Sequence, residues 1–155
     1  MEDVLKGIAD EQLAIYQRAL NLKLKFITEA KAFRKNNNYM FYEPNVKNVN
    51  DVTYIYWQDV KFYFDRRASS KDSNSYKIHK RHMSMGKGAN RYASNKFRSK
   101  APELHLVLAF EKEFAKLRSY GKELSLLRKQ ATKSKSLKDV INWQEDVDLK
   151  DLLDD

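Results

Sequence analysis

Apolar residues recur at helical spacing through the first part of the chain. From about Glu2 to Lys35 they fall three or four positions apart, or at multiples of these steps, which places them on one helical stripe. The residues of this stripe are Leu5, Ile8, Ile15, Ala19, Leu22, Phe26 and Phe33. A second stripe is made by Leu13, Tyr16, Leu20, Leu24 and Ile27. The pattern predicts one long helix, which Gly7 could interrupt, and a helix with two apolar faces is expected to pack inside a bundle or between subunits.

The next segment carries turn signals and then a dense aromatic run. Asn36–Asn38 suits a helix exit, and Pro44 with the asparagine-rich run 45–50 predicts a loop. The run 52–64, VTYIYWQDVKFYF, is compatible with two interpretations. Helical spacing is seen in Val52, Tyr56, Val60 and Tyr63, and strand-like alternation in Val60, Phe62 and Phe64. The helix is favoured, because the neighbouring patterns are helical and no turn signal divides the run into a hairpin.

A second long helix is predicted from Glu103 to about Thr132, because Pro102 suits a helix start. Its apolar positions alternate by three and four like the seam of a coiled coil, and therefore predict self-association. The seam residues are Val107, Phe110, Phe114, Leu117 and Leu124. The serines at 134 and 136 are expected to end this helix, and a short helix should follow over residues 137–147.

These elements give the expected fold class, which is mainly α, with long helices in a bundle or coiled-coil-like oligomer and a long basic loop between them. The expected organisation is a single helical domain over residues 1–144, with the basic loop at 66–100, followed by an acidic C-terminal tail at 145–155. The tail holds six acids against Lys150. It is expected to be either a fraying helix or a tail that recruits a basic partner, and it could also compete with nucleic acid for the basic surface of its own chain.

The strongest chemical signal is the stretch from Arg66 to Lys100. It holds eleven basic residues against Asp72 alone, a surplus of ten that exceeds the +9 of the whole chain. It has too little contiguous apolar surface to form a core, so it predicts a loop. Positive charges interleaved with aromatic side chains suit nucleic acid, because cations neutralise phosphates and aromatic rings stack on unpaired bases.

Fourteen residues are therefore candidates for nucleic-acid binding, the last two on a second basic surface in the final helix. They are Arg66, Arg67, Lys77, Lys80, Arg81, Lys87, Arg91, Tyr92, Lys96, Phe97, Arg98, Lys100, Arg128 and Lys129. Two alternatives stay open. The stretch could be a solvated loop without a ligand, and Tyr92 and Phe97 could fold down as anchors in the core instead of stacking on bases.

Several classes of site are missing from the sequence. The chain has no cysteine, which excludes disulfides, a thiol nucleophile and cysteine-ligated zinc. Gly86-Lys87-Gly88 lacks the remainder of a phosphate-binding loop, and the basic neighbours of His79 and His82 would repel a metal ion. We find no nucleophile with its base, so no enzyme, metal or cofactor is expected. The acidic N-terminus is not a signal peptide and no run is long enough to span a membrane, which suggests a cytoplasmic protein.

From its last long helix onward the chain resembles the UvsY family of phage recombination mediators. The run Leu137-Lys138-Asp139-Val140-Ile141-Asn142-Trp143 is similar to the pattern that ends those proteins, and Phe62-Tyr63-Phe64 looks like their aromatic pair before a variable loop. The basic insert from His79 to Lys100 is longer and more positive than the family norm, and the acidic tail is extra. The resemblance implies a phage-encoded helical oligomer that binds single-stranded DNA and helps a RecA-like recombinase to replace the single-strand-binding protein.

The sequence therefore predicts one function and one alternative. The first is a non-catalytic protein that binds single-stranded DNA or RNA as a homo-oligomer, with a recombination mediator that assists a recombinase as its most concrete form. The alternative is a small phage-like regulatory or inhibitor protein whose basic loop binds a protein or nucleoprotein partner. The salt dependence of oligonucleotide binding separates the two functions.

Overall fold

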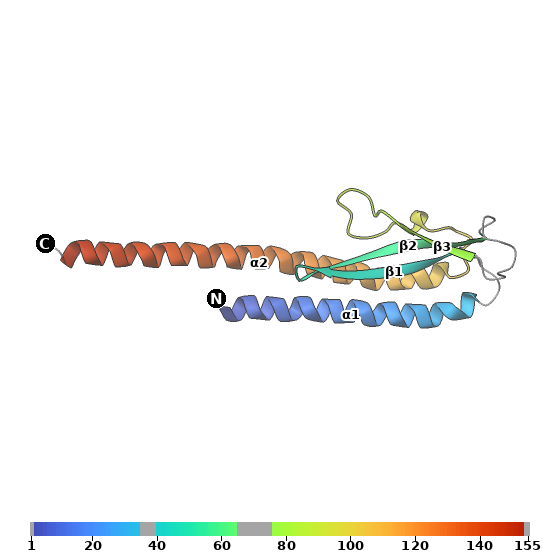
Figure 1. The fold of residues 1–155 in the computed structure, drawn as a ribbon, viewed down its shortest axis with the longest axis horizontal. Helices are drawn as coiled ribbons and strands as arrows, with labels where there is room; N and C mark the ends of the chain where they lie inside the picture. The colour runs from blue at the N-terminus through green and yellow to red at the C-terminus, as the bar shows by residue number, and fades with distance from the viewer. Residues whose placement is uncertain (1, 35–39, 65–75, 154–155) are drawn as a thin grey trace.

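The protein combines two long helices with a three-stranded antiparallel sheet (Figure 1). The computed structural model describes residues 2–34, 40–64 and 76–153. In chain order the elements are α1 (Glu2–Arg34), β1 (Met40–Val49), β2 (Val52–Phe64), β3 (Tyr76–His82), the short 3-10 helix η1 (Ser94–Lys96) and α2 (Leu104–Leu153). This is an α/β fold, so the prediction of a mainly α bundle is wrong.

The aromatic run that was expected to be a helix is the central strand β2. It pairs with β1 on one side and β3 on the other, and Val49 faces Val52 across a two-residue turn. The turn residues Asn50 and Asp51 have φ of 51° and 66°. Positive φ at both positions is what a tight hairpin of this length requires, and Asn and Asp tolerate it. The predicted loop at 45–50 is therefore the end of β1 and the first residue of this turn.

Burial alternates over residues 42–46 and 54–57, so this part of the hairpin has one buried face and one more exposed face, whereas Phe41 and Val60 on the second face are also buried. On the buried face Tyr42, Val46, Ile55 and Trp57 are all at most 8% exposed. Pro44 is also buried opposite Trp57, and its missing N–H is tolerated because β1 is an edge strand. Period-two burial of this kind is the property of a half-buried strand.

Trp57 is the residue at which four segments meet. Its ring makes edge contacts with Phe26 of α1, Phe114 of α2 and Phe97 of the segment before α2, at centroid distances of 5.0, 5.8 and 5.8 Å. Trp57, Phe26 and Phe114 are fully buried. Edge-to-face packing of large rings contributes beyond the area it buries, so this cluster fixes the two helices against the sheet.

Both helices were located by their spacing, but their partners differ from those expected. α1 runs without a break at Gly7 and buries its first stripe, whereas Leu13 and Leu24 of its second stripe are 53% and 63% exposed. In α2 the seam residues Val107, Phe110, Phe114 and Leu124 are buried and Leu117 is partly buried, all within this one chain. The seam was expected to join subunits, but in the structure it packs against α1 and the sheet of its own chain.

α2 is also longer than the sequence predicted. It continues through Ser134 and Ser136 to Leu153, so the expected break and the separate short helix are wrong. Its C-terminal part extends well past the sheet and past the start of α1 (Figure 1). None of the helices in the described ranges is both long and apolar enough to cross a membrane.

Candidate nucleic-acid interface

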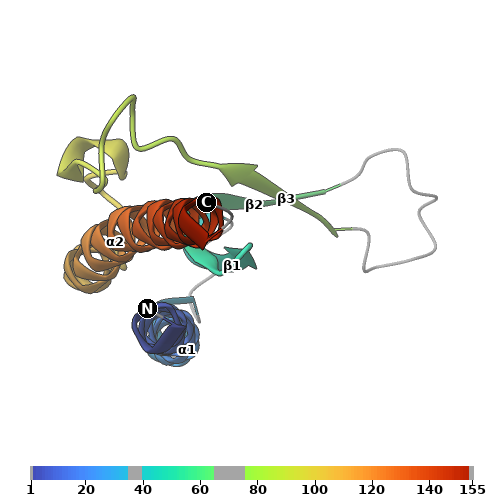
Figure 2. The same cartoon turned by 90° about the vertical axis from the view of Figure 1, so that its left-hand side faces the viewer.

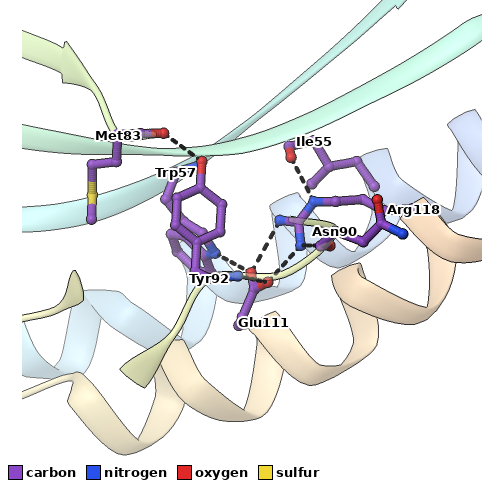
Figure 3. Close-up of polar contacts among 7 residues, drawn as sticks. All are labelled: Ile55, Trp57, Met83, Asn90, Tyr92, Glu111 and Arg118. Atoms are coloured by element: carbon purple, nitrogen blue, oxygen red, sulfur yellow. Dashed lines mark hydrogen bonds and ion pairs between the residues drawn. The ribbon is translucent and has the colours of Figure 1, made fainter. Parts of the chain in front are cut away.

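A buried ion pair on α2 holds the segment after β3 in place (Figure 3). The Arg118 guanidinium donates to both carboxylate oxygens of Glu111, at 2.5 and 3.0 Å, and the two side chains are only 7% and 6% exposed. Arg118 also donates to the carbonyl oxygens of Ile55 on β2 and of Asn90, at 2.8 and 3.2 Å. One guanidinium therefore ties the helix, the sheet and the segment after β3 together.

Glu111 and Tyr92 complete this network. Glu111 accepts hydrogen bonds from the indole N–H of Trp57 at 2.7 Å and from the backbone N–H of Tyr92 at 3.1 Å. The Tyr92 hydroxyl donates to the carbonyl of Met83 at 2.6 Å and accepts from the backbone N–H of Trp57 at 3.1 Å. Burial raises the pKa of Tyr92 above its usual value of 10.0, so this hydroxyl keeps its proton and its donor role.

The segment from Met83 to Lys100 is therefore docked on the core. Tyr92 and Phe97 are each 4% exposed and belong to the main apolar cluster. They are the core anchors that the sequence left open as an alternative, and their rings cannot stack on bases while they stay buried. Viewed along the helices, the segment passes over α2 on the side away from α1 (Figure 2). The expectation of a loop that takes no part in the core is wrong for this segment.

Two arginines of the candidate set are partly committed to a buried acid. Asp59, whose side chain is 8% exposed, lies 3.4 Å from both Arg81 and Arg98. Arg98 also stacks over the Tyr42 ring at 4.8 Å, and its backbone N–H donates to the Tyr42 hydroxyl. A buried carboxylate needs such partners, so Arg98 in particular has a structural role.

The remaining candidates divide into exposed, paired and undescribed residues. Lys87, Arg91, Lys96, Lys100 and Lys129 are exposed. Lys80 is half-exposed and lies 3.3 Å from Glu43, and Arg128 lies 3.3 Å from Asp51 at the hairpin turn. Arg66 and Arg67 fall outside the described residues, as does the side chain of Lys77. The second basic surface, around Arg128, lies on α2 and begins where the helix passes the hairpin turn of the sheet.

The open face of the sheet carries aromatic residues that sequence reasoning assigned to a buried helix. The pairing registers place Lys47, Tyr54, Tyr56, Lys80 and His82 on this face, which we call the outer face. The same face also holds Glu43, Asn45 and Gln58, and the buried pair Phe41 and Val60. Tyr54 is 53% exposed. The period-two alternation from Val52 to Gln58 is the signal that could have found this face.

Contacts on the outer face hold Tyr56 in a fixed position. The imidazole of His82 packs on its ring at a centroid distance of 4.4 Å, and the Lys47 ammonium lies over it at 5.6 Å. The amide of Asn45 donates to the Tyr56 hydroxyl at 2.7 Å. Tyr54, two residues earlier on the same strand, faces Lys47. The face thus presents aromatic rings beside ammonium groups, which is the combination that stacks bases and neutralises phosphates.

Among the described residues, no three side chains of the His, Cys, Asp or Glu type gather where they could hold a metal ion. No curated protein and no solved structure matches the chain. One family model does match, over residues 15–132, which includes most of α1, the whole sheet and the packed part of α2. This match covers most of the sequence, and the chain belongs to the family described as MobI protein.

Proposed function

We propose that the chain is a non-catalytic protein that binds nucleic acid through the outer face of its sheet, with the exposed basic residues of β3 and of the segment after it extending the surface. The observation that carries the proposal is Tyr54, an aromatic side chain left half-exposed on a sheet face that also holds two lysines. An aromatic ring beside ammonium groups combines a surface for base stacking with charges that neutralise phosphates.

Single-stranded nucleic acid is the ligand that suits this face best. Tyr54 and Tyr56 are neighbours on one side of a strand, which puts them roughly 6.6 Å apart, and sheets that bind single strands use aromatic side chains in this way to stack successive bases. The bases of a duplex are already stacked, so exposed rings add little to duplex binding. The preference is therefore assigned first to Tyr54, with the partly buried Tyr56 held beside it by His82 and Lys47, where the sequence had placed it on Tyr92 and Phe97.

The family is described only as mobilisation-related, and this description does not name a ligand. We propose single-stranded DNA as the ligand to test first, with RNA of the same sequence as the comparison. The role as a mediator for a recombinase stays a prediction from the UvsY resemblance.

Fluorescence anisotropy with labelled single strands and duplexes of the same sequence tests the proposal. Tyr54→Ala should weaken single-strand binding roughly 5- to 150-fold, the equivalent of ~1–3 kcal/mol per stacked base, and should change duplex binding little. Tyr120→Ala is the matched control, because Tyr120 is a 42% exposed tyrosine on α2 whose hydroxyl donates to Glu11 of α1 and not to the sheet. Equal single-strand affinity for both variants and the wild type would reject the outer face as the interface.

Failure to bind any oligonucleotide at low salt would have a different meaning. It would favour the protein-directed alternative, in which the basic surface contacts a protein or a nucleoprotein complex. Binding with a flat salt dependence would also count against phosphate contacts, because neutralising each phosphate of a single strand contributes about 0.7 to the log–log slope.

A further inference from the structure

The C-terminal part of α2 extends beyond α1 and the sheet, which pack against its first part. The hairpin turn reaches α2 at Arg128, where Asp51 lies 3.3 Å away, and the start of α1 reaches it at Lys135, 3.6 Å from Glu2. Residues 136–153 continue as helix beyond both contacts (Figure 1). This is about 27 Å of helix at roughly 1.5 Å per residue. A single helix of this length is marginal in water, so its stability calls for a partner.

One face of α2 carries exposed leucines on both sides of the point where the packed part of the helix ends. Leu126 and Leu137 are 52% and 55% exposed. They are eleven residues apart, three turns of an α-helix, and so lie on one face. Val140 and Ile141 follow Leu137 at spacings of three and four, which continues the same stripe in the sequence. An exposed apolar stripe on a projecting helix is typical of a helix–helix interface.

The charges along α2 identify the partner. Residues 122–138 hold six basic residues against Glu123, a net of +5, and residues 145–155 hold six acids against Lys150, a net of −5. Two copies of this helix side by side in parallel would bring like charges together along the whole length. Two copies in antiparallel order bring the basic part of each beside the acidic part of the other.

We propose that a second copy of this chain packs antiparallel against the C-terminal part of α2, with the two-fold axis passing near residue 140. Such an interface uses the same surface on both copies, as two-fold dimers do. It places Lys129 of one copy beside Asp151 of the other, and Lys133 beside the segment around Asp148. It covers the stripe at Leu137 and offsets the charge of both ends. The continuous helix carries the acidic residues up to Leu153 away from the sheet of its own chain (Figure 1).

The mass of the full-length protein, measured by light scattering over a dilution series at low salt without nucleic acid, tests the dimer. The expected result is twice the 18.3 kDa of one chain, falling towards one chain on dilution. Added salt should weaken the dimer, because exposed charges more than about 10 Å apart are screened at 0.1 M. A single-chain mass at every concentration would overturn the proposal.

A pair of charge reversals tests the antiparallel order. Lys129→Glu with Lys133→Glu, and separately Asp148→Lys with Asp151→Lys, should each raise the dissociation constant of the dimer roughly tenfold or more, because each variant faces itself with like charges. A mixture of the two variants should form dimers again, because unlike charges then meet at both ends. Lys25→Glu with Lys31→Glu is the control, since both lysines are exposed on α1, and it should leave the dimer intact.

The mixing result separates the proposal from other assemblies. Variants that stay dimeric alone place the interface elsewhere, and variants that are monomeric both alone and mixed exclude the antiparallel contact. Either result would overturn the assignment. Lys129 and Lys133 are exposed, and circular dichroism before mixing shows whether each variant keeps its helix content.

Discussion

Glu111 and Arg118, two turns apart on α2, form a buried ion pair whose second set of hydrogen bonds fixes β2 and the segment after β3 against the helix (Figure 3). The pair explains how a segment with many basic residues becomes ordered: its backbone N–H at Tyr92 and carbonyl at Asn90 are satisfied by the two charged side chains. The outer face depends on this arrangement, because the Arg118 guanidinium also donates to the carbonyl of Ile55 and so holds β2 against α2.

Removing one partner of this pair should be costly. Glu111→Gln keeps the shape of the side chain but leaves the Arg118 charge buried without its carboxylate, so we expect a loss of about 3–5 kcal/mol in the free energy of unfolding. Urea denaturation measures this loss. Glu113→Gln is the control, because the Glu113–Lys116 pair at 3.0 Å is 45% and 64% exposed and should contribute no more than about 1 kcal/mol. Similar effects for the two variants would contradict the structural role of the buried pair.

The Tyr92 hydroxyl should make stability depend on pH in the alkaline range. Its pKa is raised in the folded state by burial, so folding favours the protonated form. The contribution is complete below the unfolded value of 10.0 and is lost as the pH rises from there through the folded pKa. Tyr92→Phe should remove this part of the alkaline loss, seen as a smaller drop in melting temperature above pH 10 than in the wild type.

The same variant should be less stable at neutral pH. Without the hydroxyl, the backbone N–H of Trp57 and the carbonyl of Met83 lose their partner, at a cost of about 1–3 kcal/mol. Tyr54→Phe serves as the control for both measurements, because its ring is half-exposed. An alkaline profile for Tyr92→Phe parallel to that of the wild type would contradict the assigned cause.

The helices could be predicted from the sequence and the sheet could not, for physical reasons. The stripe from Ile8 to Phe26 and the seam from Val107 to Leu124 repeat every three and four residues over many turns. This period can be recognised in the sequence even when the surface against which the helix packs is unknown. The partner itself is a tertiary property, so the same seam suggested an oligomer where the chain packs on itself. The hairpin was missed because the loop was predicted over residues 45–50, so Asn50 and Asp51 were not recognised as a two-residue turn.

The candidate site was only partly predictable. Exposed cations such as Lys87 and Lys96 follow from composition alone, because charged residues in a polar stretch stay at the surface. Tyr92 and Phe97 are isolated aromatics among basic residues and carry no period, so their burial depends on the pocket that Trp57, Glu111 and Phe114 provide. Tyr54 became a candidate only when alternation along β2 placed it opposite the buried face.

Phe97 gives a test that separates core anchoring from base stacking. Its ring is 4% exposed and packs on Trp57 and Tyr42 at centroid distances of 5.8 and 5.1 Å. Phe97→Ala should leave a cavity and lower the free energy of unfolding by about 3–5 kcal/mol, while the ratio of single-strand to duplex affinity stays unchanged at a temperature where the variant is folded. Loss of that ratio without loss of stability would return Phe97 to the interface.

The exposed cations of the segment after β3 should supply affinity without selectivity. Lys87, Arg91 and Lys96 are exposed, whereas Lys80, Arg81 and Arg98 each lie near a carboxylate, so the first three can be changed without uncovering a buried acid. Phosphates are the same in every nucleotide, so replacing these three residues by Ala should weaken single strands and duplexes alike.

The salt dependence gives the number of phosphates that these cations contact. The log–log slope for single strands should fall by about 0.7 for each phosphate contact that is lost, up to roughly 2 for all three. Lys25→Ala with Lys31→Ala on α1 makes a comparable change of charge away from the proposed surface and should leave the slope nearly unchanged. If the control flattens the slope as much as the triple variant does, the binding reflects only the net charge of the chain, and the segment after β3 is not a contact surface.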